Sequence, residues 1–275
     1  MLIATFCALA AAVLHASWNL ALKQGGDRFS AATLQFLFGG LLFFPVMLVA
    51  GVPTGEALGW LAISTLVHLG YVSFLVRAYH HGDFSMAYPL ARGSGAVLAA
   101  LGGAILLDDL IPPLGVAGIA IAGVGLLALM SFGGTKEAYA WALATGVLIS
   151  TYTLVDTQGS RASNGLGYAA AQGVTVGVSL SLVGVVSGRY SILVTAARRS
   201  GRRYALAGVA SVLAYGLVLV GVNYAPVGYV AVLRETSVIL GPIGGWLLLH
   251  EQLGQRRAVA AAVVVLGMVV LIVAR

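Results

Sequence analysis

The most restrictive feature of this sequence is a series of apolar stretches, each about 20 residues long, that recur from one end to the other. A helix of about 20 apolar residues crosses the roughly 30 Å hydrocarbon core of a bilayer. Charged residues make up only 9% of the chain, whereas soluble domains carry about 25%. The chain is therefore expected to be an all-α, polytopic membrane protein without a water-soluble domain.

Ten such stretches can be delimited, and each is predicted to be a transmembrane helix. Glycine, proline and asparagine residues typical of turns separate them. The apolar segment at the N-terminus lacks a preceding basic segment and is longer than the apolar region of a typical cleavable signal peptide. It is therefore predicted to be retained as the first span. The longest gap, between Ser187 and Tyr204, is predicted to be a loop. The ten spans cover residues 2–22, 30–51, 57–79, 84–107, 113–131, 139–157, 165–187, 204–224, 227–249 and 254–274.

The two halves of the chain repeat one pattern. Arg92 and Arg234 lie 142 positions apart, and each falls inside an apolar stretch. The segment VLHASWNLALKQG at 13–25 also aligns with VLISTYTLVDTQG at 147–159, which matches an aromatic residue and a Gln-Gly pair. Each copy holds five spans. Because five is odd, the second copy must enter the membrane in the opposite orientation.

The distribution of basic residues agrees with an inverted repeat of residues 1–133 and 134–275. In the first copy, basic residues flank the loops after the first and third helices; in the second copy, they concentrate after the second and fourth. They are Lys23, Arg28 and Arg77, and then Arg189, Arg198, Arg199, Arg202, Arg203, Arg256 and Arg257. Equivalent loops thus have opposite charge bias, as the positive-inside rule requires of inverted copies. Both termini are predicted to face outside.

Several function classes find no support in the sequence. Most of the basic residues behind the net charge of +6 lie in or beside predicted loops. Basic residues beside membrane spans set orientation and contact anionic lipid headgroups, so nucleic acid is not expected as a partner. Cys7 is the only cysteine and cannot form an internal disulfide. No nucleotide-binding or hydrolase motif occurs, and His80-His81-Gly82-Asp83 lacks a partner cluster for a metal. Neither a cofactor nor a metal is expected.

Further motifs occur at matching places in the two halves. An acidic residue closes the fourth helix of each half, Asp109 and Glu251, and a glycine-bearing helix follows each. YPLARGSG at 88–95 and LRETSVILGPIGG at 233–245 complete the pattern. The sequence resembles, over nearly its whole length, the ten-helix EamA-type branch of the drug/metabolite transporter superfamily. Asp109 departs from the glutamate that is usual in the first half of that family.

The resemblance implies a secondary transporter of a small metabolite such as an amino acid. It also implies a central cavity lined by the first, third and fourth helices of each half, with the fifth helices as outer support. Members of the family often move their substrates outward, so an exporter in a bacterial inner membrane is expected. The resemblance does not name the substrate, because one fold serves many functions.

Arg92 and Arg234 are the first candidates for substrate binding. A charge near the bilayer centre costs from about 3 to more than 10 kcal/mol unless it faces protein or water. Arg92 lies about 12 Å into its span by helical rise, and Arg234 lies at a similar depth, so snorkelling to the headgroups is difficult. A polar cavity and a purely structural pairing are the alternatives. Two converging guanidinium groups would suit a carboxylate, phosphate or phosphonate. Tyr88, one turn before Arg92, is a further candidate for the substrate site.

Side chains on the first helix of each half are the next candidates. His15, Trp18 and Asn19 share one helical face, and the matched helix carries Tyr152 and Asp156. If these faces meet, they line the cavity. The alternatives are a hydrogen-bonded core histidine and an aspartate that is merely solvated at the membrane surface.

Proton coupling has three candidates. Glu235 follows Arg234 but points about 100° away from it on a helix, so the two do not pair on one face. Glu235 either pairs with Arg92 across the repeat interface or changes its protonation between two access states. His15 and Asp156 are the other candidates.

The sequence therefore predicts a secondary-active transporter that works by alternating access on a small, anionic or zwitterionic metabolite. The chain is not expected to be an enzyme. An intramembrane enzyme with His15 as base would need a nucleophile or metal cluster at one depth, and the sequence shows none. A non-transporting scaffold or receptor is the other alternative. The predicted partners are the substrate, the lipid bilayer and a proton; both a monomer and a homodimer remain open.

Overall fold

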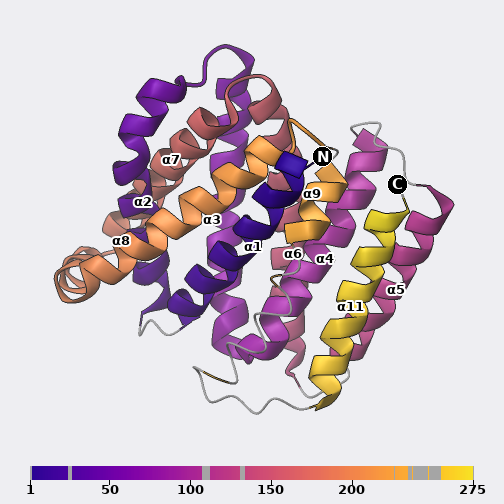
Figure 1. Cartoon of the computed structure of the whole chain (residues 1–275). Coiled ribbons are helices and arrows are strands. Elements are labelled where there is room, and N and C mark those ends of the chain that lie inside the picture. Colours follow the sequence, from indigo (N-terminus) through magenta and orange to yellow (C-terminus); the bar gives the residue numbers. More distant parts are fainter. Residues whose placement is uncertain are drawn as a thin grey trace.

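The structure is a computed structural model that describes residues 2–23, 27–106, 112–130, 134–225, 227–234, 237, 247 and 255–274. Within these ranges the chain forms helices and no strand, as Figure 1 shows. The helices are α1 (Leu2–Lys23), α2 (Arg28–Ala50), α3 (Glu56–His81), α4 (Phe84–Leu106), α5 (Pro113–Met130), α6 (Lys136–Arg161), α7 (Gly165–Val186), α8 (Tyr190–Gly221), α9 (Val227–Arg234) and α11 (Gln255–Val273).

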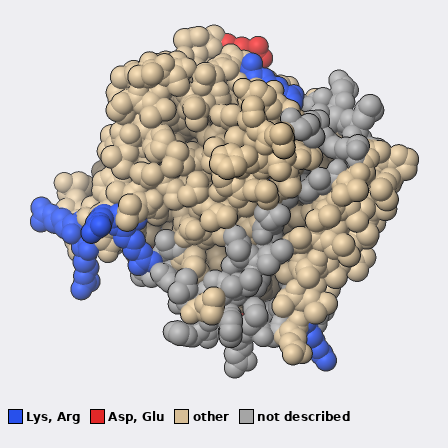
Figure 2. Space-filling view, in the orientation of Figure 1, with Lys and Arg blue, Asp and Glu red and all other residues tan. Residues whose placement is uncertain are grey.

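Seven of the described helices, α1 to α4 and α6 to α8, are long and apolar enough to cross a membrane. Their outer faces carry exposed apolar side chains, such as Val49 at 90% and Ile105 at 77% exposure. In a water-soluble protein such residues would be costly, whereas in a bilayer they face acyl chains. Few charged side chains interrupt this surface in Figure 2. The predicted all-α, multi-pass membrane protein is confirmed.

The beginning of α8 differs from the prediction. Residues expected to form a loop are helical from Tyr190 onward, and the helix bends at Ser200, whose backbone angles (φ −138°, ψ 20°) are not helical. The short first segment is amphipathic: Leu193 is buried at 7% exposure, whereas Arg198 and Arg199 are exposed. This segment is short and apolar on one side only, so its sequence contains no long apolar stretch that would predict a helix.

Backbones touch in a seam between α2 and α7. A Cβ atom added at Gly40 would lie 2.7 Å from the Cα atom of Val174, and one added at Gly177 would lie 2.6 Å from the Cα atom of Leu37. Residue numbers rise along one helix as they fall along the other, so the two helices are antiparallel. Gly40 and Gly177 are 137 positions apart, and so are Leu37 and Val174.

A second seam joins α5 to α11. A Cβ atom at Gly125 would lie 2.6 Å from the backbone nitrogen of Val264, and one at Gly267 would clash with the backbone nitrogen of Ala122. This contact is again reciprocal and antiparallel. Gly125 and Gly267 are 142 positions apart, and so are Ala122 and Val264, which is the distance in sequence between Arg92 and Arg234. In Figure 1 the two seams lie at opposite sides of the molecule.

Alanine at Gly125 is expected to destabilise the protein, because a methyl group there meets a backbone that cannot rotate away. Overpacking of this kind costs about 1–3 kcal/mol. Gly123, two residues earlier in α5, has open space where its Cβ would lie, so Gly123→Ala should instead gain about 0.5–1 kcal/mol from helix propensity. Thermal unfolding in detergent measures both variants. Melting temperatures that shift in the same direction would contradict the assigned seam.

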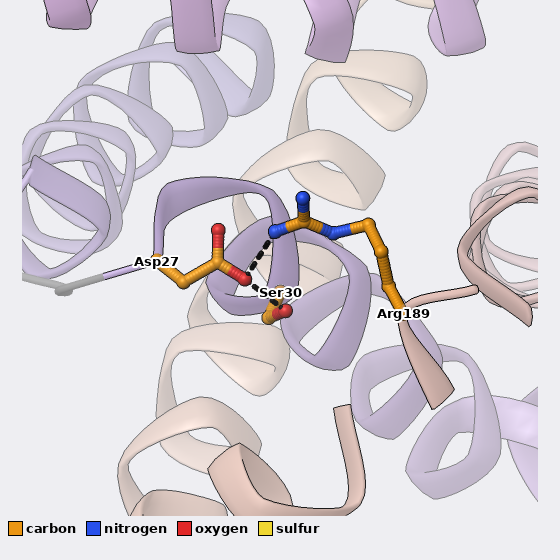
Figure 3. Close-up of polar contacts among 3 residues, drawn as sticks. All are labelled: Asp27, Ser30 and Arg189. Carbon is orange, nitrogen blue, oxygen red and sulfur yellow. Dashed lines mark hydrogen bonds and ion pairs between the residues drawn. The ribbon is translucent and has the colours of Figure 1, made fainter. Parts of the chain in front are cut away.

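A polar contact joins the two halves at one end of the bundle. Arg189, just before α8, donates to the Asp27 carboxylate over 2.6 Å, and the Ser30 hydroxyl donates to the same oxygen, as Figure 3 shows. The Arg189 guanidinium also lies 5.2 Å from the centre of the Phe29 ring. The α1–α2 and α7–α8 connections therefore lie at the same end.

The Asp27 contact predicts a pH-dependent stability. Burial raises the pKa of this carboxyl, but the hydrogen bonds from Ser30 and Arg189 and the Arg189 charge outweigh burial, so the pKa falls below its ordinary value. The stabilisation is then present at neutral pH and lost as the pH falls below about 4. Both side chains are 35% exposed, which limits it to about 1 kcal/mol at most.

Arg189→Gln should therefore lose less thermal stability than the wild type between pH 6 and pH 3.5. Arg161→Gln, an exposed arginine at the end of α6, serves as the control and should follow the wild type. Identical acid dependence in wild type and Arg189→Gln would show that the contact does not stabilise the fold.

Candidate functional site

A small cavity lies among α1, α2, α3, α6, α7 and α8, inside the bundle. Its volume is about 30 Å³, which holds a water molecule or two. A metabolite fits only if the helices separate. The described lining residues are mostly aromatic or polar: His15, Trp18, Phe36, His68, Tyr71, Tyr152, Gln172, Ser211, Val212 and Tyr215.

Stacked rings form most of the cavity wall. His68 stacks on Tyr152 with ring centroids 4.3 Å apart. Tyr71 and Tyr215 meet Tyr152 edge-on at 5.3 and 5.9 Å. On the first helix, His15 meets Trp18 edge-on at 4.9 Å. Rings from helices far apart in the sequence thus converge, and their hydroxyl and ring nitrogen atoms supply polar groups to an otherwise apolar wall.

His68 is the most connected polar residue of this wall. Its Nδ1 lies 2.9 Å from the Ser64 carbonyl oxygen and 3.2 Å from the Ser64 hydroxyl, and its Nε2 lies 2.7 Å from the Gln172 amide nitrogen. These contacts fit a neutral ring that donates from Nδ1 and accepts from Gln172 at Nε2. The hydrogen bonds therefore hold the ring orientation between α3 and α7.

Asp156 is fully buried one turn after Tyr152. Its carboxylate accepts hydrogen bonds from the Tyr168 hydroxyl, at 3.0 Å, and from the Tyr215 hydroxyl. The Ser64 hydroxyl is a further partner of the carboxylate. Because Ser64 also contacts His68, one hydroxyl links the imidazole to the carboxylate. Hydroxyl donors replace water around a buried charge and lower its cost.

Arg92 on α4 and Arg234 at the end of α9 are almost completely buried, at 2% and 1% exposure. This is not the arrangement of a snorkelling arginine, whose guanidinium reaches water. Both charges act electrostatically on His15 and on Tyr71. The two arginines therefore lie near the same part of the cavity wall, although neither belongs to its described lining.

Some of the other predicted residues line the cavity in the structure, and others do not. Trp18, Tyr152 and His15 line the cavity. Tyr88 stacks on Phe84 at 4.8 Å and does not belong to the described lining of the cavity.

Asn19 contributes to contacts between helices rather than to the described cavity wall. The amide of Asn19 donates to the His15 carbonyl oxygen over 3.0 Å and accepts from the Tyr79 hydroxyl over 2.9 Å. The first bond lies within α1 and the second connects α1 to α3. Asn19 is absent from the described cavity lining. Glu235 lies outside the described residues, as do Asp109 and Glu251.

Sequence reasoning missed seven of the described lining residues, and four of them carry most of the polar contacts or rings of the wall: His68 and Tyr71 on α3, Gln172 on α7 and Tyr215 on α8. One signal was available, because a histidine is costly in an apolar span and usually faces the interior of a bundle. The second signal was the resemblance itself, which implied that the third helix of each half lines the cavity.

A larger groove lies between α1 and α8. Its volume is about 680 Å³, and Trp18 lines it as well as the internal cavity. The indole therefore forms part of the wall of both spaces, and its Nε1 has no hydrogen-bond partner among the described residues.

Comparisons with known proteins agree with this fold. Residues 136–273, just over half of the chain, match the model of the EamA-like transporter family. One solved crystal structure of a protein covers 97% of this chain and 95% of its own, with a TM-score of 0.71 and 20% sequence identity. At that identity the likeness concerns the fold alone. No curated protein matches the chain.

Proposed function

Because this chain belongs to the EamA-like transporter family, we propose that it is a secondary-active transporter of a small metabolite. It is an integral, multi-pass membrane protein. The observation that carries the proposal is the internal cavity: a small space lined by rings and polar groups, with two buried guanidinium charges acting on its wall. Polar and charged groups are costly within apolar helices, so a core that served packing alone would not be expected to concentrate them in one place.

The proposed architecture is ten transmembrane helices arranged as two inverted repeats, residues 1–133 and 134–275. The two seams support it. Each is antiparallel and reciprocal, and equivalent residues of the two helices are separated by a constant offset: 137 positions in the first seam, and in the second the 142 positions that also separate Arg92 from Arg234. Such reciprocity is expected when two copies of one unit pack about a pseudo-two-fold axis in the membrane plane.

The proposed substrate is a small molecule with an anionic group, such as an amino acid. Arg92 and Arg234 would hold that group, because a guanidinium matches a carboxylate or phosphate in a bidentate geometry. Trp18, Tyr88 and Tyr152 would form the walls. The contacts of Asn19 support a positioning role for it, in which it holds α1 against α3.

Proton coupling is proposed at Asp156. Its carboxylate connects through Ser64 to His68 and so to the cavity wall. A proton bound there in one access state and released in the other would link the substrate to a pH gradient. Glu235 and His15 remain the other candidates. Export across a bacterial inner membrane is the proposed direction, by likeness to the family.

The size of the cavity supports a mechanism of alternating access. A space of about 30 Å³ admits no metabolite, so binding requires α1 and α8 or their counterparts to separate. The substrate would shift the populations of open and closed states through its different contacts in each.

Counterflow in proteoliposomes tests the proposal. Vesicles loaded with one unlabelled compound should accumulate the same labelled compound, for at least one member of a panel of amino acids, carboxylates, phosphonates and sugars. A preceding thermal-shift screen selects the panel, because a bound ligand raises the melting temperature. A compound that binds but gives no counterflow would favour a receptor instead.

A further inference from the structure

The groove between α1 and α8 has two chemically different parts. One end carries four arginines within six positions, and Figure 2 shows basic side chains projecting from the edge of the molecule at the beginning of α8. Apart from Ser17 and from Ser200 and Gly201 between the arginines, the remaining wall is apolar. The arginines are Arg198, Arg199, Arg202 and Arg203, and the apolar part comprises Trp18, Leu206, Ala207 and Ala210.

The apolar part of the groove opens toward the lipid side of the bundle. Leu206 is 62% exposed on α8, and Val13, one turn before Ser17 on α1, is 58% exposed. Large apolar side chains at this exposure face acyl chains in a membrane protein. Arg198 and Arg199 lie just before the bend at Ser200, and Arg202 and Arg203 lie just after it, ahead of the apolar part of α8. A basic residue at the end of an apolar helix reaches the headgroup level.

We propose that this groove binds one anionic phospholipid, with its phosphate among the arginines and an acyl chain along the apolar wall. Charge complementarity favours a phosphate, since four guanidinium groups gather there and no acidic residue occurs among the described lining residues. The apolar wall favours a lipid over free phosphate, because free phosphate would leave Leu206 and Ala210 uncovered. The volume of about 680 Å³ is within the range of specific ligand sites.

The groove adjoins the internal cavity, and Trp18 forms part of the wall between them. Helix α1 belongs to the first half of the chain and α8 to the second, and Trp18 contacts both spaces. A lipid between these helices would favour the state in which they are separated at this end. The proposed lipid site does not depend on the proposed transport function. Only the effect of the lipid on the separation of α1 and α8 rests on that function.

The test is thermal unfolding of the full chain in detergent with added dioleoyl-phosphatidylglycerol. A saturable rise of the melting temperature by several degrees is expected, since the lipid binds the folded state. Dioleoyl-phosphatidylcholine and inorganic phosphate are the comparison probes, and neither should reproduce the rise.

Two kinds of variant separate the parts of the groove. The double variant Arg198→Gln and Arg202→Gln removes rim charge, and Ser17→Phe fills the groove while keeping every charge. Both sites are exposed, so folding should survive, and each variant should lose most of the rise. The control is the double variant Arg161→Gln and Arg256→Gln, which removes two exposed arginines elsewhere and should keep it.

Three results would overturn the proposal. An undiminished rise in both groove variants would place the lipid elsewhere. An equal rise with phosphatidylcholine or inorganic phosphate would show that the site does not recognise an anionic phospholipid. An equal loss in the control would show attraction to net charge alone. Because these readouts are binding measurements, they stand whether or not counterflow is found.

Discussion

Replacing Arg92 or Arg234 by glutamine is expected to lower counterflow of an acidic substrate by about two orders of magnitude. Loss of one partner from a buried, charge-assisted contact costs roughly 2–5 kcal/mol, and every 1.4 kcal/mol is a factor of ten. Lysine at the same position should give an intermediate rate, because it keeps the charge but not the bidentate geometry. Initial counterflow rates in proteoliposomes measure the effect.

The control for these variants must remove an arginine without touching the buried pair. Arg161→Gln serves, because this side chain is exposed at the end of α6. Size-exclusion profiles and melting temperatures should show that the variants fold. Wild-type counterflow in both Arg92→Gln and Arg234→Gln would refute the role of the arginines in holding the anionic group, while leaving transport itself intact.

Asp156→Asn is expected to abolish accumulation driven by a pH gradient while counterflow continues. Asparagine has nearly the same shape, and its carbonyl oxygen accepts hydrogen bonds from the Tyr168 or Tyr215 hydroxyl as the carboxylate does, but it cannot exchange a proton. A coupled transporter that loses its titrating group still exchanges substrate for substrate. The measurement compares uptake with and without an imposed gradient of either sign.

Asp83→Asn is the matched control, because Asp83 is exposed in the turn between α3 and α4. It should keep both gradient-driven accumulation and counterflow. If Asp156→Asn also keeps gradient-driven accumulation, the coupling group lies elsewhere, and Glu235→Gln becomes the next variant. Loss of both activities in Asp156→Asn, with a lower melting temperature, would assign the carboxylate a structural role.

The spans were predictable because their cause is local. An apolar stretch must match the bilayer thickness, so its ends can be located from the sequence: the predicted spans of 84–107 and 165–187 correspond to the helices Phe84–Leu106 and Gly165–Val186. The amphipathic beginning of α8 was not predictable in this way. Its helix depends on one buried side chain, Leu193, finding a place in the folded bundle.

The candidate site was predictable only in part. Trp18 and Tyr152 were found through the sequence repeat, which predicted that the helices carrying them line one cavity, and both side chains lie in its wall. The contact of His68 with Gln172 joins residues 104 positions apart, and no helical periodicity indicates which polar residues of two such helices will meet. Asn19 shows the converse case, since it shares a helical face with cavity residues yet uses its amide between helices.

The seams of α2 with α7 and of α5 with α11 have a mechanical consequence. Where backbones touch without interlocking side chains, two helices can pivot with little steric resistance. The seams lie at opposite sides of the molecule (Figure 1), so a line through both would serve as a fulcrum. Tilting one half about that line would widen the mouth at one membrane surface and narrow the mouth at the other, with each glycine seam nearly stationary.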